Sequence, residues 1–208
     1  LIIGKSQNKK FRYFKLDNND TKKGAEFLKK VGLNKNSWFV TLHVREDNNK
    51  NTSENFRNSN PFNYIKAIKK ITSNGGFVFR MGDKNSSMFP KMENFYDYAH
   101  SDFKSDLLDV FLAAKSKFCV GTPSGFYAVA NSFGVPVLLT NVAQFSTYYS
   151  LHKQDILIPR LIQDKKKIKY LNLNNIFSGP YLWFYSDLQF KKKNVISIEN
   201  DENDISDG

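Results

Sequence analysis

Cysteine and long apolar runs are nearly absent from this sequence. Its one cysteine, Cys119, excludes an internal disulfide and therefore the small secreted folds that disulfides hold together. Cys119 lies in an apolar run, where a small buried residue is expected rather than a reactive thiol. No stretch of about 18 apolar residues occurs, so a transmembrane helix is not expected. With a mean hydropathy of −0.50, the sequence favours a soluble protein, and a reducing cytoplasm is its predicted location.

Several motifs that would mark a known chemistry are also missing. There is no GxGxxG for a dinucleotide cofactor and no GxxxxGK[ST] for a P-loop. The three histidines, His43, His100 and His152, are too far apart in the sequence to suggest a metal site, and no metal or other cofactor is predicted. Residues 121–125 read Gly-Thr-Pro-Ser-Gly, which misses the GxSxG elbow of serine hydrolases by one position.

What the sequence does have is an excess of basic charge. Lysine and arginine total 31 against 20 acidic residues, which gives a formal net charge of +11. Such a protein attracts phosphates, nucleic acid or acidic lipid. The lysines are scattered, however, apart from runs at 165–169 and 191–193, and solvated lysines account for them. A noncatalytic basic module that binds nucleic acid, or a scaffold, is the alternative function; the main prediction has no nucleic-acid partner.

The length of 208 residues suits one large or two small domains. The first residues do not resemble a signal peptide and include no initiator methionine, so we expect the chain to begin partway through a longer protein. Residues 1–36 are expected to be a linker or the end of a missing N-terminal domain. Residues 37–170 are expected to form one domain, and 171–208 a C-terminal extension that truncation could have shortened.

Strand and helix patterns alternate over about 120 residues of this sequence. Apolar runs of strand length predict strands at 38–44, 77–81, 117–121, 135–139 and 155–158, with a short one near 95–98. Helical periodicity predicts helices at 21–31 (after an N-cap at Asp20), 61–74 (with Pro61 in its first turn), 102–115 and 124–133. This alternation predicts an α/β fold with a Rossmann-like parallel sheet and helices on both faces. The acidic stretch 199–208 is either a tail or the first turn of a helix.

Three of the predicted strands end in polar loops, and ligands of open parallel sheets bind beyond the carboxyl ends of strands. In the first loop, His43 and Arg45 point to the same side. Arg45 could hold a phosphate through two hydrogen bonds, and His43 could donate another. The alternative is a surface arginine paired with Glu46 or Asp47.

The second loop follows a strand that contains Arg80. Burying an arginine without a partner is costly, which favours a binding role for this one. Gly82 and Asp83 come next, and Asp83 could accept hydrogen bonds from a ribose or a base. The alternative is a salt bridge between Arg80 and an aspartate that closes the edge of the sheet.

The third loop, which leads into a helix, contains Thr122, Ser124 and Gly125. The N–H groups and dipole of a helix N-terminus attract anions, and Gly125 lets the backbone approach a ligand closely. The two hydroxyl groups add donors. The alternative is that Ser124 only caps its helix. Taken together, the three loops predict a phosphate site.

In this order, the segments Leu-His-Val-Arg-Glu (42–46), Arg-Met-Gly-Asp (80–83) and Gly-Thr-Pro-Ser-Gly (121–125) resemble a group of bacterial glycosyltransferases. That group is similar to the protein O-fucosyltransferases and the α-1,6-fucosyltransferases. The resemblance covers residues 38–160. It implies a GT-B fold of two Rossmann-like domains, of which this chain is mainly the C-terminal one, with 37–170 binding a nucleotide sugar. The implied reaction transfers the sugar to a glycan, lipid-linked or protein acceptor without a metal.

The resemblance also implies roles for individual residues. Arg45 is the catalytic residue, which contacts the β-phosphate of the donor and stabilises the leaving group. The predicted substrate-binding residues are His43, Arg80, Gly82, Asp83, Thr122, Ser124 and Gly125.

Two acidic residues stand out in the same resemblance. Asp109 matches an acidic position of the family that we leave without a role. Glu46 stands where fucosyltransferases often carry a second basic residue, which argues against GDP-fucose as the donor. Glu46 is a possible general base, although pairing with Arg45 is the simpler expectation.

Overall fold

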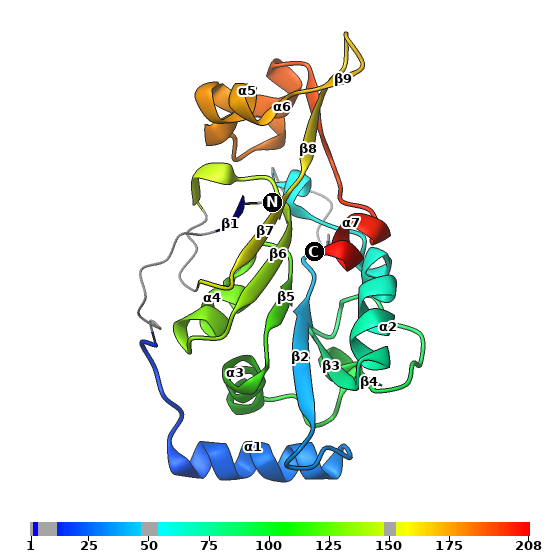
Figure 1. Ribbon diagram of the computed structural model, residues 1–208, viewed down its shortest axis with the longest axis vertical. Helices are drawn as coiled ribbons and strands as arrows, with labels where there is room; N and C mark the ends of the chain where they lie inside the picture. The colour runs from blue at the N-terminus through cyan, green and yellow to red at the C-terminus, as the bar shows by residue number, and fades with distance from the viewer. Residues whose placement is uncertain (1, 4–11, 47–53, 148–152) are drawn as a thin grey trace.

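A central seven-stranded sheet and a smaller three-stranded sheet form the framework of the computed structural model (Figure 1). The structure describes residues 2–3, 12–46, 54–147 and 153–208. The strands are β1 (Ile2–Ile3), β2 (Trp38–His43), β3 (Gly76–Met81), β4 (Phe95–Tyr96), β5 (Cys119–Gly121), β6 (Val137–Val142), β7 (Ile156–Pro159), β8 (Leu161–Asp164), β9 (Lys169–Tyr170) and β10 (Val195–Ile198). The α-helices are α1 (Asn18–Lys30), α2 (Ile65–Ser73), α3 (Asp106–Lys115), α4 (Gly125–Ser132), α5 (Leu173–Ser178), α6 (Asp187–Lys192) and α7 (Glu202–Asp207). The 3-10 helices are η1 (Asn55–Arg57), η2 (Pro61–Tyr64), η3 (Tyr98–His100), η4 (Phe145–Thr147) and η5 (Pro180–Trp183).

The large sheet has its strands in the order β1-β7-β6-β5-β2-β3-β4. Strand β1 pairs antiparallel with β7, and the other six strands run parallel. From β2 the chain moves to one side through β3 and β4, whereas from β5 it moves to the other side through β6 and β7. The order therefore reverses between β2 and β5, and this topological switch point is where Rossmann-like sheets bind ligands.

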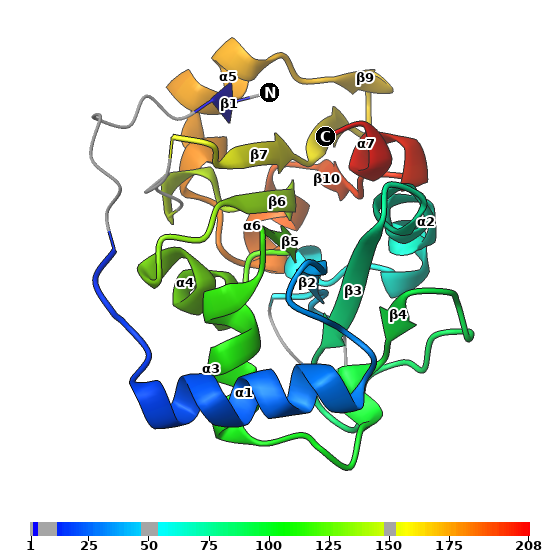
Figure 2. The same ribbon diagram turned by 60° about the horizontal axis from the view of Figure 1, so that its bottom comes forward.

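Helices cover both faces of this sheet, as the sequence predicted (Figure 2). Helices α2 and α7 lie on one face, whose core includes Ile68 and Val40. Helices α1, α3 and α4 lie on the other, where Phe39 and Phe79 pack edge to face at a ring distance of 5.2 Å. Neighbouring residues of β2 thus belong to opposite cores, which explains why its sequence is apolar throughout rather than alternating.

The predicted starts of two helices were wrong. Helix α1 begins at Asn18 rather than after Asp20, because the side chain of Asp17 accepts a hydrogen bond from the backbone N–H of Asp20 at 2.7 Å. Helix α3 begins at Asp106 rather than at residue 102, and Ser105 is its N-cap. The cap of α1 is therefore Asp17 rather than Asp20, and α3 starts only where Ser105 supplies a capping oxygen.

Beyond the large sheet, the chain forms a second layer at the top of Figure 1. It consists of the antiparallel sheet β10-β8-β9 with α5 and α6. Its core includes Ile162, Phe184 and Phe190, together with Phe56 from the loop that follows β2. The boundaries expected after residues 36 and 170 stay predictions; α1 precedes the first one, and β10, which follows the second, pairs with β8.

The acidic end of the chain forms a helix rather than a tail. The side chain of Asp201 accepts hydrogen bonds from the backbone N–H groups of Asn203 and Asp204, which starts α7. Its buried residue Ile205 joins the core on the α2 side of the sheet. The helical alternative for this stretch is therefore the correct one.

Candidate functional site

The ends of β2 and β5 are joined at the switch point by two hydrogen bonds. The backbone N–H of Thr122 donates to the carbonyl of His43 at 3.0 Å, and the N–H of Arg45 donates to the hydroxyl of Thr122 at 2.7 Å. Gly121 pairs with His43 across the two strands, and a Cβ at position 121 would lie 1.9 Å from the His43 carbonyl oxygen. The first and third predicted loops are thus brought together.

His43 is held in place on two sides. Its Nδ1 lies 3.0 Å from the hydroxyl oxygen of Ser124, and its ring stacks on Phe126 at 5.4 Å. Burial, together with the positive charge of Arg80, lowers the pKa of His43 to about 4. The imidazole is therefore neutral at pH 7, with one nitrogen that donates and one that accepts.

Ser124 sits at the N-cap of α4, yet its side chain makes no capping hydrogen bond. Its hydroxyl is directed to His43 instead, so simple capping does not describe this residue. Gly125, the first residue of the helix, is exposed, and a Cβ there would meet no atom within 4 Å among the parts of the chain that the structure describes. The N-terminus of α4 is accordingly open to a ligand.

Arg45 forms an ion pair with Glu54, a partner that the sequence analysis did not name. Its guanidinium lies 3.2 Å from the carboxylate of Glu54, whereas Glu46 faces elsewhere and Asp47 lies outside the described residues. The same oxygen of Glu54 contacts Arg57 at 2.5 Å. Arg57 also donates to the carbonyl of Pro123 at 3.3 Å, which ties this cluster to the turn before α4.

Arg80 is fully buried, with 0% of its side chain exposed. Its guanidinium contacts Glu46 and lies 3.7 Å from Asp97, and it stacks over the ring of Phe89. This matches the salt-bridge alternative, with Glu46 as an additional partner. The expected contact of Arg80 with a ligand stays a prediction. Glu46 also accepts the backbone N–H of Ser87 at 2.8 Å, so both of its oxygens have partners here, and it is poorly placed to act as a base.

A cavity of about 220 Å³ opens beside the switch point. It is lined by His43, Met81, Gly82, Asp83, Lys104, Asp109 and Phe126. Asp83 is exposed at its mouth. Lys104 and Asp109 form an ion pair at 2.9 Å. Asp109, which the sequence analysis left without a role, therefore has a partner in this cavity. The second predicted loop therefore borders the same place as His43, through Gly82 and Asp83 rather than Arg80.

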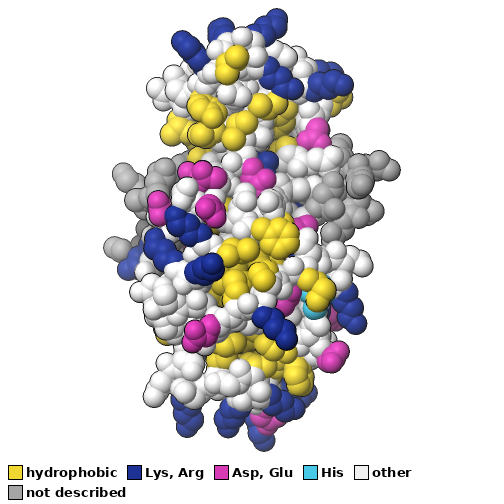
Figure 3. Space-filling view, turned by 90° about the vertical axis from the view of Figure 1, so that its right-hand side faces the viewer, with side chains coloured by type: hydrophobic (Ala, Val, Ile, Leu, Met, Phe, Trp, Pro, Cys, Tyr) yellow, Lys and Arg dark blue, Asp and Glu magenta, His cyan; other side chains and the backbone are white. Residues whose placement is uncertain are grey.

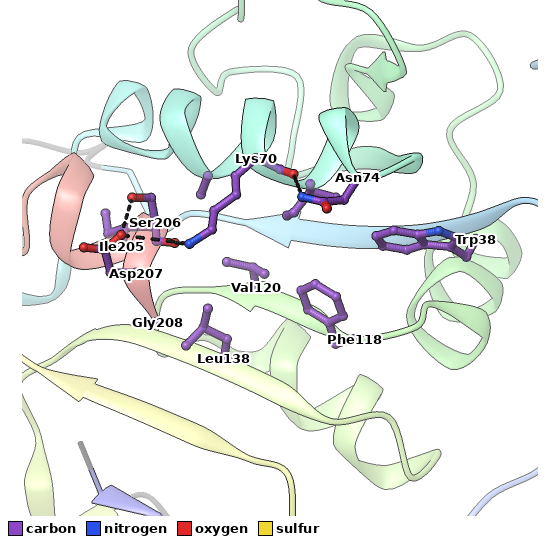
Figure 4. Close-up of a pocket in the computed structure, with 12 residues that line it drawn as sticks. Trp38, Lys70, Asn74, Phe118, Val120, Leu138, Ile205, Ser206, Asp207 and Gly208 are labelled. Atoms are coloured by element: carbon purple, nitrogen blue, oxygen red, sulfur yellow. Dashed lines mark hydrogen bonds and ion pairs between the residues drawn. The ribbon is translucent and has the colours of Figure 1, made fainter.

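A second cavity, of about 280 Å³, lies on the face of the sheet between α2 and α7 (Figure 4). Figure 4 shows Trp38 and Phe118 near the amino ends of β2 and β5, with Val120 and Leu138 further along the sheet. Lys70 reaches across to α7, where it donates to the carbonyl of Ser206. Its walls on the sheet are apolar and it lies on a face of the sheet, not beyond the carboxyl ends of the strands, so we place the candidate site at the switch point.

The surface carries no continuous basic stripe on the face drawn in Figure 3, where lysine and arginine side chains are interspersed with acidic and hydrophobic ones. Across the described ranges, no helix is long and apolar enough to cross a membrane. Within the same ranges, no group of three or more His, Cys, Asp or Glu residues is placed to hold a metal ion.

No protein-family model matches this chain, and no curated protein matches it either. Several solved structures, however, are similar to it. A glycosyltransferase family 9 protein from Veillonella parvula is similar with a TM-score of 0.51 at 12% identity, over 87% of this chain and 52% of that one. The ADP-heptose heptosyltransferase II of E. coli has a TM-score of 0.48 at 12% identity, over 70% and 44%. TibC of enterotoxigenic E. coli, described as an iron-containing dodecameric glycosyltransferase, has a TM-score of 0.37 at 19% identity, over 61% and 31%.

The fold is of the GT-B type. This confirms the predicted fold class, a Rossmann-like parallel sheet with helices on both faces, as in one half of a GT-B fold. The chain spans about half the length of the Veillonella protein, 52% of it. At 12% identity the similarity concerns the fold alone, and the resemblance to fucosyltransferases in particular stays a prediction.

Proposed function

We propose that this chain is the donor-binding part of a glycosyltransferase, which binds a nucleotide diphosphate sugar and helps to transfer the sugar to an acceptor hydroxyl. One observation carries the proposal: His43, Arg45 and the Thr122–Ser124 turn meet at the switch point of a GT-B-type sheet, where phosphate ligands of such sheets bind. The family 9 glycosyltransferase among the similar structures supports sugar transfer as the reaction.

In this proposal the diphosphate lies between Arg45 and the N-terminus of α4. As the bond between the sugar and the diphosphate breaks, negative charge grows on the leaving group. Arg45, the hydroxyl of Thr122 and the first N–H groups of α4 are fixed donors that stabilise this charge without reorganising. Preorganised protein donors then take the place of a divalent cation, so the proposed reaction needs no metal.

The neutral His43 suits this site because it can donate a hydrogen bond to a phosphate oxygen without carrying a charge of its own. If Nδ1 accepts a hydrogen bond from the Ser124 hydroxyl, Nε2 is the ring nitrogen that carries the hydrogen and can donate it to the phosphate. The 220 Å³ cavity beside it would receive the nucleoside, with Asp83 accepting hydrogen bonds from the ribose or base. Substrate binding by Gly82, Thr122, Ser124 and Gly125 belongs to the same proposal.

The acceptor, whether a glycan, a lipid-linked sugar or a protein, would be held by the other half of a GT-B enzyme. The isolated chain would then bind the donor without transferring the sugar. A cytoplasmic location also stays a prediction.

Calorimetric titration with GDP, UDP, ADP and CMP tests the donor site. We expect saturable binding of one of the diphosphates and weaker binding of CMP. Arg45→Ala should lower the affinity by about tenfold to a hundredfold, because hydrogen bonds to charged groups contribute about 1.5–3 kcal/mol each. Lys22→Ala, which removes an exposed positive charge from α1, is the matched control and should bind as the parent chain does.

Salt dependence separates the proposal from nucleic-acid binding. Binding of a nucleic acid through scattered lysines should weaken by orders of magnitude as salt rises and should not depend on Arg45. If no nucleotide binds to a chain that circular dichroism shows to be folded, the donor-site proposal fails, and the noncatalytic alternative takes its place.

A further inference from the structure

The cluster beside Arg45 contains a second arginine that the sequence did not single out. Arg57, on η1, and Arg45, after β2, both contact the same carboxylate oxygen of Glu54, at 2.5 and 3.2 Å. Side-chain exposures are 26% for Arg45, 21% for Arg57 and 38% for Glu54, so the three groups lie at the surface of the site rather than in the core. A carboxylate held between two guanidiniums has the arrangement in which arginines bind a phosphate.

We propose that Arg57 is a second phosphate-binding residue, and that Glu54 occupies the place of the phosphate until an anionic ligand displaces it. The inference rests on the proposed function in one respect, the identity of the ligand as the diphosphate of a nucleotide sugar. The anion site itself follows from the cluster.

Charge supports this reading. Two arginines against one glutamate leave the cluster with a net charge of +1. The fully ionised diphosphate of a nucleotide sugar carries two negative charges, one on each phosphate, which the two guanidiniums would match once Glu54 has moved away. The neighbouring carboxylates are engaged elsewhere, since Glu46 contacts Arg80, and Asp187 accepts the backbone N–H groups of Asn55 and Phe56.

The position of Arg57 relative to α4 also supports it. Its guanidinium donates to the carbonyl of Pro123, the residue before the N-cap of α4, at 3.3 Å. An anion at the N-terminus of that helix would therefore lie within the reach of Arg57 as well as Arg45. Among the described residues, none accepts a hydrogen bond from the buried Nε of Arg57, so its pairing with Glu54 leaves this arginine incompletely satisfied.

Glu54 can leave without disturbing the backbone that carries it. Asp187 anchors the first N–H groups of η1 at 3.0 and 2.9 Å, which fixes the turn. The carboxylate at the end of the partly exposed Glu54 side chain needs only a change of rotamer to turn towards solvent, and such changes are fast. The backbone of the site then stays as it is while the anion and the carboxylate exchange.

The competing role for Glu54 is to position the two arginines for the ligand, and the two roles predict opposite signs. If Glu54 competes with the ligand, Glu54→Gln should bind anions about threefold to tenfold more tightly, because partly exposed ion pairs contribute about one kcal/mol or less each. If Glu54 positions the arginines, the same variant should bind more weakly.

The experiment is calorimetric titration of the full chain with inorganic pyrophosphate, and in parallel with the nucleotide that binds best. The variants are Glu54→Gln, Arg57→Ala and Arg57→Lys. Glu26→Gln is the matched control, because it removes the same charge from an exposed position on α1, at the other end of the strands. Thermal unfolding of each variant shows that it is folded.

We expect tighter pyrophosphate binding by Glu54→Gln, no change in Glu26→Gln, at least tenfold weaker binding by Arg57→Ala, and partial recovery in Arg57→Lys. Weaker binding by Glu54→Gln, unchanged binding by Arg57→Ala, or no pyrophosphate binding by the parent chain each overturns the inference. If pyrophosphate follows the expected pattern but no nucleotide binds, the anion site stands, and the nucleotide-sugar function fails.

Discussion

Gly121 is the residue at which the two halves of the site come closest. It ends β5 directly beside the main chain of His43, and even a methyl group there would lie 1.9 Å from the His43 carbonyl oxygen. The backbone of β2 would have to move for any side chain to fit. A Cβ on Gly125, four residues further on, would meet no atom within 4 Å among the residues that the structure describes. The two glycines of this motif therefore differ in role: Gly121 allows two strands to approach closely, whereas Gly125 leaves space at the start of α4.

Alanine substitutions at these two positions should have opposite outcomes. Gly121→Ala should lower the free energy of unfolding by more than about 3 kcal/mol, because it forces two backbones apart at the centre of the sheet. Gly125→Ala should leave stability within about 1 kcal/mol of the parent chain, since alanine is at least as good a helix former. Urea unfolding of both variants measures the difference. Equal stabilities would mean that β5 can shift away from His43.

His43 gives the protein a defined dependence on pH. Its folded pKa of about 4 lies below the ordinary value of 6.5, so between these two values the unfolded chain binds a proton that the folded chain does not. Stability contributed by the neutral imidazole is therefore complete above about pH 6.5 and is lost as the pH falls, by at most about 1.4 kcal/mol per pH unit.

Urea unfolding at pH 7, 6 and 5 tests this. As the pH is lowered from 7 to 5, the free energy of unfolding of the parent chain should decrease more steeply than that of His43→Gln. The variant has no imidazole to titrate at this position. His100→Gln retains His43 and should keep the part of the slope that comes from it. Parallel curves for the parent chain and His43→Gln would contradict the lowered pKa.

At this scale the sequence predicted which loop residues lie together at the switch point, while their role in binding stays a prediction. Four of these residues could be identified because they lie at or just after the end of an apolar run of strand length, and parallel strands bring their carboxyl ends to one edge. They are His43, Arg45, Thr122 and Ser124. Arg57 could not be identified, because it lies in a polar loop with no periodicity, and only the docking of η1 brings it to Pro123.

At the scale of elements, the contact between η1 and α6 connects the second layer to the site. Asp187, in the first turn of α6, accepts two backbone hydrogen bonds from η1, and Phe56 of η1 is buried in the core of the second layer. The turn that carries Glu54 and Arg57 is therefore held by a part of the chain more than a hundred residues away.

Asp187→Ala should loosen this turn without unfolding the sheet. Two backbone N–H groups would lose their acceptor, at a cost of about 1–3 kcal/mol. Amide hydrogen exchange of Asn55 and Phe56 should accelerate by about tenfold to a hundredfold, while amides of β2 keep their protection. Asp201→Ala, which removes a similar cap from α7, is the control and should leave the exchange of Asn55 unchanged. Unchanged exchange of Asn55 in Asp187→Ala would show that Phe56 alone holds the turn.

The elements themselves were easier to predict than their ends. Runs such as 38–44 and 77–81 are apolar because both faces of the strands are buried, and this signal is local. Two details depended on tertiary packing instead. Ala25 of α1 is apolar but exposed, because Gly24 is the residue that packs against the ring of Phe111. Val129 of α4 is likewise apolar and 37% exposed.

At the scale of the whole molecule, the α/β class follows from the alternation of strand and helix, but the strand order does not. The reversal between β2 and β5 depends on α3 crossing the sheet after β4, and β4 is only Phe95–Tyr96, too short for its sequence to define it. The small sheet could not be predicted either. Its strands β8, β9 and β10 are short, and β10 reaches its partner β8 from about thirty residues later in the sequence, so no local pattern joins them.

The thiol in the middle of the large sheet offers a way to measure the opening of that sheet by chemical labelling. Cys119 is 1% exposed, and burial raises the pKa of its thiol to about 12, so a thiol reagent cannot react with it while β5 stays between β2 and β6. Each modified sulfur therefore records one opening of the sheet. Since no other cysteine competes for the reagent, the rate of labelling rises with the fraction of molecules in which the sheet is open, and a bound anion that stabilises the closed sheet should slow it.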